Sequence, residues 1–424
     1  MQTSVVSTFE GGYQPLTAIS AVTSLAQAGH SAELVDTYVE GDDVSRFSSS
    51  EAVAISVPLF DSLRTGVDLA DRIRSVNPTA PIIFFGQYAT LNAERLSEMS
   101  GDFTVVGEWE KALAGLITHL DQPSSHPVPV SVVDRASSRK PLPSLDMPRD
   151  HFRLPHRNVA PALHKYPQPQ IERLLGGPHI VGGLEATRGC HHRCTYCSVF
   201  AAYDGKVLVV GDDIVIEDAS NLVEMGMTHL SFTDAEFFNT KRNGIRILRE
   251  LHRRFPKLTY DFTTRVDHII ENKDILEEMA TLGVRFITSA LEFPKQAVLD
   301  QVAKELSLDM IDEAIALLRT SSITLNPTFI MFNPWIDLED VIQFEDFVSR
   351  NALEDVIDPI QFETRLHLYK GSPLLQNPTI QALALTEHEF HYEWSHPDPR
   401  VDELYRATVT PVEEGVFKRC CLKC

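Results

Sequence analysis

The 424-residue sequence has no cysteine outside two short segments. Its six cysteines form two triplets, Cys190, Cys194 and Cys197 within "CHHRCTYC", and Cys420, Cys421 and Cys424 within "CCLKC". This leaves no thiol for the hydrophobic core and argues against a disulfide framework spread along the chain. In a reducing compartment, cysteines clustered in this way are typical of metal sites or catalytic thiols.

Other absences narrow the class of protein. No apolar run reaches the length of a membrane span, and residues 1–16 lack the basic start and apolar stretch of a signal peptide. We therefore expect a cytoplasmic protein that does not bind membranes. The formal net charge of −21 repels phosphate backbones, and no basic patch offsets it, so we expect no nucleic-acid partner and a small-molecule substrate.

The first 121 residues alternate strand-like apolar runs with helical patterns. Helices are expected around residues 16–28 and 63–76, and from about residues 91 and 111. Strands that alternate with helices imply a parallel sheet covered on both faces. The sequence thus predicts an α/β protein whose amino-terminal domain, residues 1–121, is a doubly wound, flavodoxin-like fold.

Beyond this domain the pattern changes twice. Residues 122–177 are rich in proline and predict an extended linker. Strand and helix patterns resume over residues 178–370, where six expected strands, ending with "DPIQFETRLHL", predict a partial (β/α)6 TIM barrel with its chemistry at the strand carboxyl ends. Residues 371–424 form a small carboxy-terminal extension. Within it, "TEHE" at residues 386–389 has the form of a capping box and predicts a short helix.

The first triplet has the spacing C-x3-C-x2-C on one loop after a predicted strand. Three thiolates in this arrangement can bind three irons of a [4Fe–4S] cluster. Because no fourth cysteine lies nearby, one iron stays open. A structural zinc or an electron-relay cluster is the alternative. His191 and His192 lie in the spacer and are expected to face solvent or cofactor rather than to bind metal.

This spacing, at the mouth of a predicted partial barrel, resembles the radical S-adenosylmethionine (SAM) superfamily. The resemblance implies that SAM chelates the open iron and that Tyr196 packs on its adenine. Further matches lie in "FTDAEFF", "FTTRVDHI", "ALEF" and the following strand; they imply SAM contacts from Asp234, Glu236, Arg265, Glu292, Asn326 and Thr328. For any single charged residue among these, an ion pair at the barrel mouth is an equal alternative.

The amino-terminal domain resembles the cobalamin-binding-type domain that precedes the barrel in some radical SAM proteins, with matches in "TVVGEWEKAL" and "FFGQYAT". The sequence lacks a D-x-H-x-x-G motif, so no histidine is marked as a lower ligand to cobalt. Since a fold does not imply a function, we expect no bound cobalamin.

The second triplet lies within the last five residues, and chain ends are commonly mobile. Three soft donors on such an arm predict a substrate holder. They can bind trivalent arsenic, a second iron–sulfur cluster, or zinc with a nearby histidine such as His388; a redox role or no role is the remaining alternative. Basic neighbours, including Arg419 and Lys423, favour the thiolate form.

With the "RCCLKC" ending, the chain resembles the radical SAM enzymes of arsinothricin biosynthesis. That resemblance implies arsenite bound by Cys420, Cys421 and Cys424, and transfer of the 3-amino-3-carboxypropyl group of SAM to arsenic. The products would be hydroxyarsinothricin and 5′-methylthioadenosine, with an electron donor such as a flavodoxin or ferredoxin. A cobalamin-dependent radical SAM methyltransferase and a non-catalytic iron–sulfur or metalloid-binding regulator remain as alternatives.

Overall fold

The computed structural model describes residues 1–136, 140–145 and 151–409. The chain divides into two compact units. The first unit comprises residues 1–168, 180–188 and 206–228, and the second comprises residues 169–179, 189–205 and 229–424. Each unit is described by itself below.

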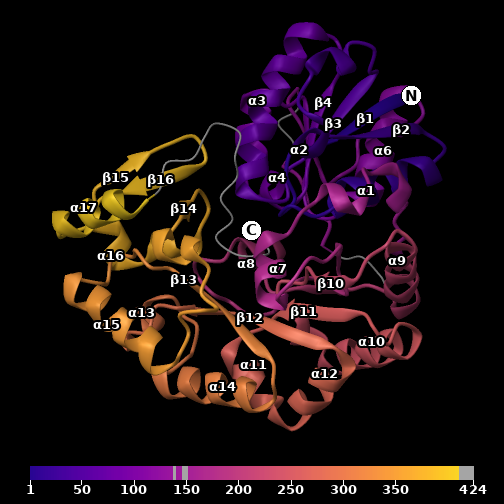
Figure 1. Cartoon of the computed structure of the whole chain (residues 1–424). Helices are drawn as coiled ribbons and strands as arrows, with labels where there is room; N and C mark the ends of the chain where they lie inside the picture. Colours follow the sequence, from indigo (N-terminus) through magenta and orange to yellow (C-terminus); the bar gives the residue numbers. More distant parts are fainter. Residues whose placement is uncertain (137–139, 146–150, 410–424) are drawn as a thin grey trace. The chain divides into compact units, whose positions relative to one another are not determined.

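The first unit is built on a six-stranded sheet with the order β2-β1-β3-β4-β5-β6 (Figure 1). Strands β1 to β5 are parallel, and β6 is antiparallel to β5. The strands span Gln2–Ser7 (β1), Ser31–Asp36 (β2), Ala52–Ser56 (β3), Ile82–Phe85 (β4), Phe103–Val105 (β5) and Val132–Asp134 (β6). The order of the parallel strands is that of flavodoxin-like folds, which confirms the predicted doubly wound domain.

Helices cover the sheet because its central strands are apolar on both faces. All residues of β3 and β4 are buried. The helices of the first unit span Leu16–Gln27 (α1), Thr37–Glu40 (α2), Phe60–Val76 (α3), Gln87–Leu91 (α4), Ala93–Glu98 (α5), Glu110–Asp121 (α6) and Asp212–Glu224 (α9). On one face, Leu25 of α1 and Leu113 of α6 pack in the same apolar cluster as Val5 and Ile83 of the sheet. The four main helices that the sequence predicts here are thus present, the third as α5, while α4 is an additional short helix before it.

The described parts of the expected linker contribute β6 and contact the carboxyl edge of the sheet. The Ser144 carbonyl accepts a hydrogen bond from the N–H of Glu108 at 2.7 Å. Gly107, with φ 83°, makes this approach possible, because a Cβ there would lie 2.4 Å from the Ser144 carbonyl oxygen. Further along, the Tyr166 hydroxyl donates to the carboxylate of Asp36 at the end of β2, at 2.5 Å.

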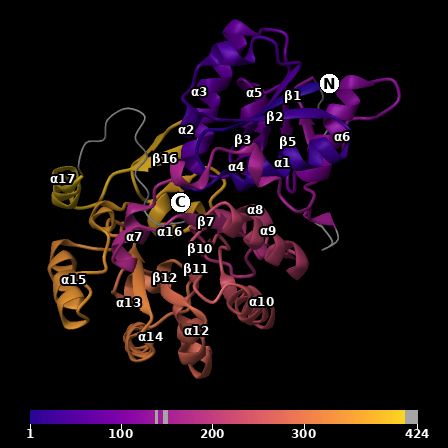
Figure 2. The same ribbon diagram turned by 45° about the vertical axis from the view of Figure 1, so that its right-hand side comes forward.

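In the second unit, four parallel strands lie side by side in the order of the chain. They span His229–Phe232 (β10), Thr259–Thr263 (β11), Val284–Glu292 (β12) and Thr324–Phe329 (β13). The connecting helices α10 (Lys241–Arg254), α12 (Leu276–Leu282) and α14 (Leu308–Thr320) lie along the outer face of this sheet (Figure 2). This βα alternation confirms a partial barrel.

The remaining elements flank these strands in the sequence. They span Pro169–Leu175 (α7), Val181–Leu184 (β7), Thr187–Gly189 (β8), Ser198–Tyr203 (α8), Val207–Val209 (β9), Val266–Glu271 (α11), Gln296–Gln301 (α13) and Leu338–Arg350 (α15). The last expected barrel strand, "DPIQFETRLHL", is not a sixth strand. It forms a 3-10 helix over Pro359–Glu363, which begins after the capping side chain of Asp358, and it keeps only one parallel bridge, Phe332 to Arg365.

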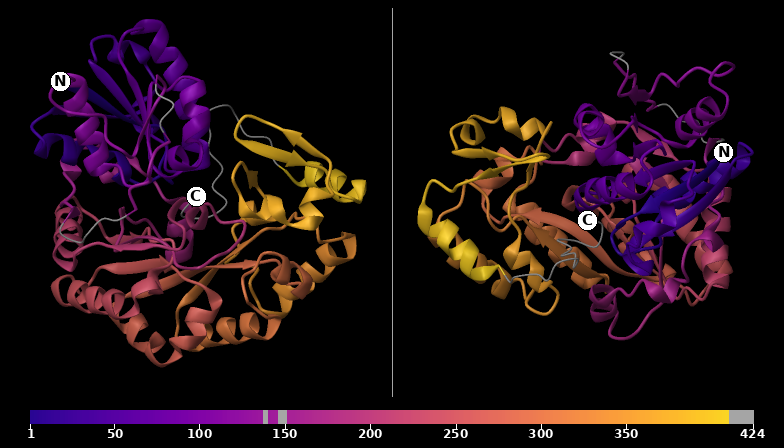
Figure 3. Two further views of the ribbon diagram at one scale, coloured as in Figure 1. Left: turned by 180° about the vertical axis from the view of Figure 1, so that it is seen from behind. Right: turned by 90° about the horizontal axis from the view of Figure 1, so that it is seen from above.

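The carboxy-terminal extension forms a small antiparallel sheet in the order β14-β16-β15 (Figure 3). Its strands span Leu368–Tyr369 (β14), Leu385–Glu387 (β15) and His391–Trp394 (β16), and its helices span Pro378–Gln381 (α16) and Pro399–Thr408 (α17). The helix predicted after "TEHE" is wrong, since these residues form the hairpin of β15 and β16. Thr386 pairs with Glu393 across that hairpin, so it does not cap a helix.

Within the described ranges, no helix combines the length and the apolar composition needed to cross a membrane.

A largely buried carboxyl group lies at the carboxyl edge of the first sheet. Glu10 accepts hydrogen bonds from the N–H groups of Thr17 and Ala18 at the start of α1, at 2.9 and 3.2 Å, and from the Ser56 hydroxyl at 3.0 Å. Burial raises the pKa of Glu10 to about 7, although these hydrogen bonds act in the opposite direction.

The folded protein therefore holds the Glu10 proton to a higher pH than the unfolded chain does. Between the ordinary pKa of a glutamate and about 7, this group lowers the free energy of unfolding by up to about 1.4 kcal/mol for each pH unit of increase. Glu10→Gln should flatten this decline, as measured by urea unfolding between pH 5 and pH 8. The exposed Glu94→Gln serves as the control; equal pH slopes for Glu10→Gln and the wild type would refute the assignment.

Candidate functional site

The predicted SAM-binding residues meet at one edge of the second sheet, because parallel strands place their carboxyl ends together. Asp234 and Glu236 follow β10, and Arg265 follows β11. Glu292 ends β12, and Asn326 lies in β13. All five are buried.

The three cysteines of the first triplet lie on the loop between β8 and α8. The N–H of Cys197 donates to the carbonyl of Cys194 at 3.1 Å, and Cys197 is the residue from which α8 begins. Cys194 is buried, and Cys190 and Cys197 are half-buried. Burial raises the pKa of all three thiols, that of Cys190 to about 12.

This donor set fits a [4Fe–4S] cluster. Without a metal the thiols are neutral, and metal binding would release their protons because the thiolate is the ligand. The part of the chain that the structure describes contains no other cysteine, so these residues supply thiolates for three irons only. The fourth iron would therefore have no cysteine ligand from this region.

Glu236 organises the ends of β10 and β11. Its carboxylate accepts hydrogen bonds from the N–H of Phe238 at 2.9 Å, the Thr264 hydroxyl at 2.6 Å and the N–H of Arg265 at 2.8 Å. It also pairs with His268 Nδ1 at 3.0 Å. Burial alone would lower the pKa of His268, but the carboxylate of Glu236 outweighs it and the pKa is raised.

Glu292 joins the cysteine loop to the end of β12. Its carboxylate accepts a hydrogen bond from the Tyr196 hydroxyl. The same carboxylate forms an ion pair with Lys304, which is 3% exposed. The backbone of Glu292 is left-handed, with φ 61°, at a point where the pairing of β12 with β13 shifts register. Such strain costs roughly 1–3 kcal/mol in a residue other than glycine, so the surrounding contacts must hold it in place.

Arg265 approaches the cysteine loop from β11. Its guanidinium pairs with Asp267 at 2.9 Å and donates to the carbonyl of Lys304 at 2.6 Å. A third contact runs to the Cys194 sulfur at 3.5 Å. Sequence reasoning missed Lys304, Thr264 and His268, since no spacing or motif marks them; only the meeting of strand ends does.

The other predicted SAM contacts are Asp234, Asn326 and Thr328. The Asn326 side chain donates to the Thr288 hydroxyl at 3.0 Å, Thr328 is half-buried, and Asp234 is buried after β10. Their roles toward a nucleoside stay predictions.

Two imidazoles of the cysteine loop, those of His191 and His192, lie near a third, that of His268. Nitrogen atoms of His191, His192 and His268 lie within 4.8 Å of one another. Burial lowers the pKa of His192 to about 4, so its ring is neutral at pH 7. The sequence predicts no metal ligation by His191 and His192. His268 pairs with Glu236, which follows β10, so the three imidazoles lie near the carboxyl end of that strand.

The carboxy-terminal extension supports the cysteine loop from another side. The N–H of Leu374 and the hydroxyl of Ser372 both donate to the carbonyl of Thr195, at 3.1 and 3.3 Å. The Tyr196 side chain packs against an apolar cluster that includes Leu374 and Trp394. Thr195 and Tyr196 lie between Cys194 and Cys197 in the sequence. The extension therefore helps to fix the distance between these two cysteines.

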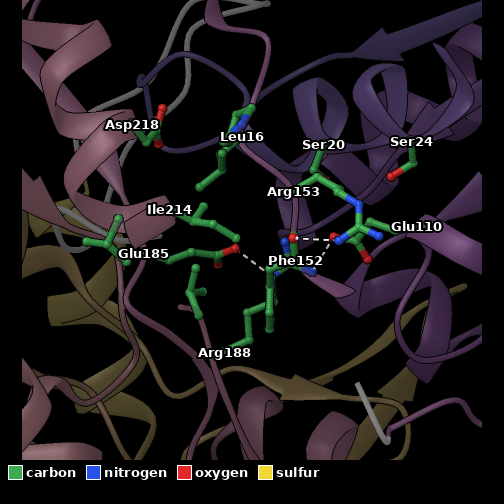
Figure 4. Close-up of a pocket in the computed structure, with 13 residues that line it drawn as sticks. Leu16, Ser20, Ser24, Glu110, Phe152, Arg153, Glu185, Arg188, Ile214 and Asp218 are labelled. Carbon is green, nitrogen blue, oxygen red and sulfur yellow. Dashed lines mark hydrogen bonds and ion pairs between the residues drawn. The ribbon is translucent and has the colours of Figure 1, made fainter. Parts of the chain in front are cut away.

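The first unit contains a buried group of charges around Arg188 (Figure 4). The guanidinium pairs with Glu108 at 2.7 Å, Glu110 at 2.6 Å and Glu185 at 2.5 Å. It also stacks over the ring of Trp109, 4.3 Å from the centroid. Burial raises the pKa of Glu108 to about 7, while Arg188 acts to lower it.

Arg188 therefore holds two buried carboxylates and one half-buried carboxylate, and it lies only two residues before Cys190 in the sequence. We expect Arg188→Met to lower the free energy of unfolding by about 3–5 kcal/mol, because it leaves buried charges without a partner. The matched control is Arg72→Met, which removes an exposed ion pair with Asp42 and should cost about 1 kcal/mol or less. Equal losses for the two variants in urea unfolding would contradict the importance of the buried group.

The proposed arsenic ligands Cys420, Cys421 and Cys424 lie outside the described residues. Their role therefore stays a prediction from the sequence.

Comparison with known proteins agrees with the site geometry. Residues 184–348 match the family model described as the radical SAM superfamily. This segment contains the first cysteine triplet and β10 to β13, and it follows the flavodoxin-like domain in the sequence.

Three known proteins are similar to this chain over most of its length. The chain is 24% identical over 329 residues to hopanoid C-3 methylase of Methylococcus capsulatus, covering 76% of this chain and 62% of the relative. It superposes on the radical SAM methyltransferase TsrM of Kitasatospora setae, solved with tryptophan and a SAM analogue, with a TM-score of 0.70, 17% identity and coverage of 88% and 74%. Cobalamin-dependent OxsB, solved with aqua-cobalamin, gives a TM-score of 0.75, 16% identity and coverage of 96% and 66%.

At these identities the solved structures establish the fold alone, and the chain spans less than two thirds of the methylase and of OxsB. TsrM and OxsB have both been solved with cobalamin, which weighs against our expectation that none binds here. In the described loops at the carboxyl edge of the first sheet, residues 8–15, 57–59, 86–87 and 106–109, there is no histidine. A cobalamin with a histidine lower ligand from these loops therefore does not fit.

Proposed function

We propose that this radical SAM enzyme transfers a carbon group from SAM to a small acceptor at the carboxyl edge of β10 to β13. The observation that carries the proposal is the loop of Cys190, Cys194 and Cys197, set beside buried Glu236 and Glu292. When bound there, a [4Fe–4S] cluster with one open iron supplies an electron to the sulfonium of SAM.

The protein would then bind SAM, orient it and exclude water. We assign the carboxylate of Glu236 to the methionine ammonium group, because its hydrogen bonds fix it in place and its charge acts on the Cys190 thiol. Glu292 and Asn326 are assigned to the nucleoside side. Burial strengthens each of these polar contacts, because water does not compete for them.

Two acceptor chemistries are supported by different observations. The relatives favour the first, methyl transfer that depends on cobalamin, since the hopanoid C-3 methylase and TsrM are named as methylating enzymes. In this chain the cofactor would have to bind without a histidine from the described edge loops of the first unit.

The second acceptor chemistry follows from the carboxy-terminal thiols. Cys420, Cys421 and Cys424 can hold trivalent arsenic through three sulfurs and leave its lone pair free. Transfer of the 3-amino-3-carboxypropyl group to that arsenic would give hydroxyarsinothricin and leave 5′-methylthioadenosine. Tethering would make the transfer effectively intramolecular, which is the physical advantage of thiol ligands on the enzyme itself.

Replacing Cys190, Cys194 or Cys197 with serine should abolish both the cluster and SAM cleavage, because a hydroxyl is a poor ligand for iron in the cluster. Iron and sulfide content and the cluster absorbance check the first effect, and mass spectrometry of SAM products checks the second. Cys420→Ser is the matched control and should retain the cluster. A full iron content in any variant of the first triplet would refute the cluster assignment.

The products of SAM separate the two acceptor chemistries. With reductant and arsenite under anaerobic conditions, arsenic transfer predicts 5′-methylthioadenosine and an arsenical product. Methyl transfer instead predicts S-adenosylhomocysteine and a bound corrinoid. SAM that survives unchanged in every condition would exclude both and leave a regulator without turnover.

Replacing Cys420, Cys421 or Cys424 with serine should remove the arsenical product and spare the cluster. Leu422→Ala is the matched control, because it alters the same segment and keeps all three thiols. A full rate of arsenical formation in the serine variants would end the proposal of a thiol-bound substrate.

A further inference from the structure

A buried cation that the proposed mechanism does not use lies next to the cysteine loop. Lys304 belongs to the loop between α13 and α14 and is 3% exposed. Its ammonium group donates to the Ala290 carbonyl at 2.7 Å and pairs with the carboxylate of Glu292. Lysine is rarely buried to this extent without a specific partner, so its position is determined by the fold.

The backbone around Lys304 is held in an unfavourable conformation. Ala303 and Glu305, the two residues on either side, have φ values of 53° and 56°, and Glu292 has φ 61°. These left-handed conformations are uncommon in residues other than glycine, and they cluster where function requires a fixed geometry. In this chain two of the three flank Lys304 in the sequence, and the third is its ion-pair partner.

A second cation, Arg265, contacts both the backbone of Lys304 and the thiol of Cys194. Arg265 donates one N–H to the Lys304 carbonyl at 2.6 Å and another to the Cys194 sulfur at 3.5 Å. Each cation also pairs with a carboxylate, Arg265 with Asp267 and Lys304 with Glu292. Cys194 thus receives a charged N–H donor, whereas no such donor to Cys190 is found among the described residues.

We propose that Arg265 and Lys304 set the reduction potential of the cluster from the side of Cys194. The proposal rests on the assigned [4Fe–4S] site but not on the group that is transferred. Reduction adds one negative charge to the cluster and its thiolates. A cation and an N–H donor at one ligand sulfur stabilise that added charge, so they raise the potential.

The same two cations would also suit the carboxylate of SAM, which is the competing explanation for their position. A measurement without SAM separates the two roles. If the cations act on the cluster, the potential changes before any SAM is added. If they serve only to bind SAM, the potential stays constant and only SAM affinity falls.

The test is a redox titration of the full-length, anaerobically reconstituted protein without SAM, followed by electron paramagnetic resonance. Lys304→Met and Arg265→Gln should each shift the midpoint to a more negative potential. We expect about a tenfold lower ratio of reduced to oxidised cluster at a fixed potential, which is about 59 mV for one electron. Lys295→Met is the control. Lys295 also follows β12, but its ammonium group pairs with Asp340 at 2.6 Å and not with Glu292.

Lys304→Met leaves Glu292 without its cation and can impair folding, so Lys304→Met/Glu292→Gln is measured in parallel. This double variant removes the pair and should still shift the midpoint in the negative direction, by less than the single variant. Unchanged midpoints in Arg265→Gln and in the double variant would overturn the proposal. A wild-type protein without any [4Fe–4S] signal would instead show that the cluster assignment itself is wrong.

Discussion

The candidate site depends on the buried ion pair between Glu292 and Lys304. Glu292 ends a central strand, Lys304 lies in a loop twelve residues further along, and the Tyr196 hydroxyl binds the same carboxylate from the cysteine loop. Three separate segments are thereby fixed relative to one another through one side chain. A carboxylate and an ammonium group are tolerated out of water only when their partners are this well placed, so the interaction constrains the geometry more than it adds to stability.

The distribution of charge around the thiols follows from the order of the strands. Glu236 after β10 lies on the side of Cys190, and its charge contributes to the raised pKa of that thiol, after burial. Arg265 and Lys304, after β11 and β12, lie on the side of Cys194, where both counteract the effect of burial on the thiol pKa. Glu292 acts against these two cations at Cys194, so the strand ends place an anion near Cys190 and both cations and an anion near Cys194.

The first unit illustrates the separation between fold and function. Its strand order is that of flavodoxin-like domains, and two of its structural relatives have been solved with cobalamin. In this chain, however, the linker binds parts of the carboxyl edge through Ser144 and Tyr166. The same architecture can hold a corrinoid or serve a purely structural purpose, and the side chains at the edge decide between them.

The sequence by itself determined the α/β architecture, the flavodoxin-like order and the cysteine loop, because apolar periodicity and ligand spacing are local properties of the chain. It misassigned "DPIQFETRLHL" and "TEHE", because an apolar or capping pattern does not specify which strand it will pair with. Only the tertiary structure showed that Lys304 pairs with Glu292, that His268 pairs with Glu236 and that Arg265 contacts the thiol of Cys194. Their positions depend on strand ends and on a strained loop that meet through contacts distant in sequence, and no local motif encodes such contacts.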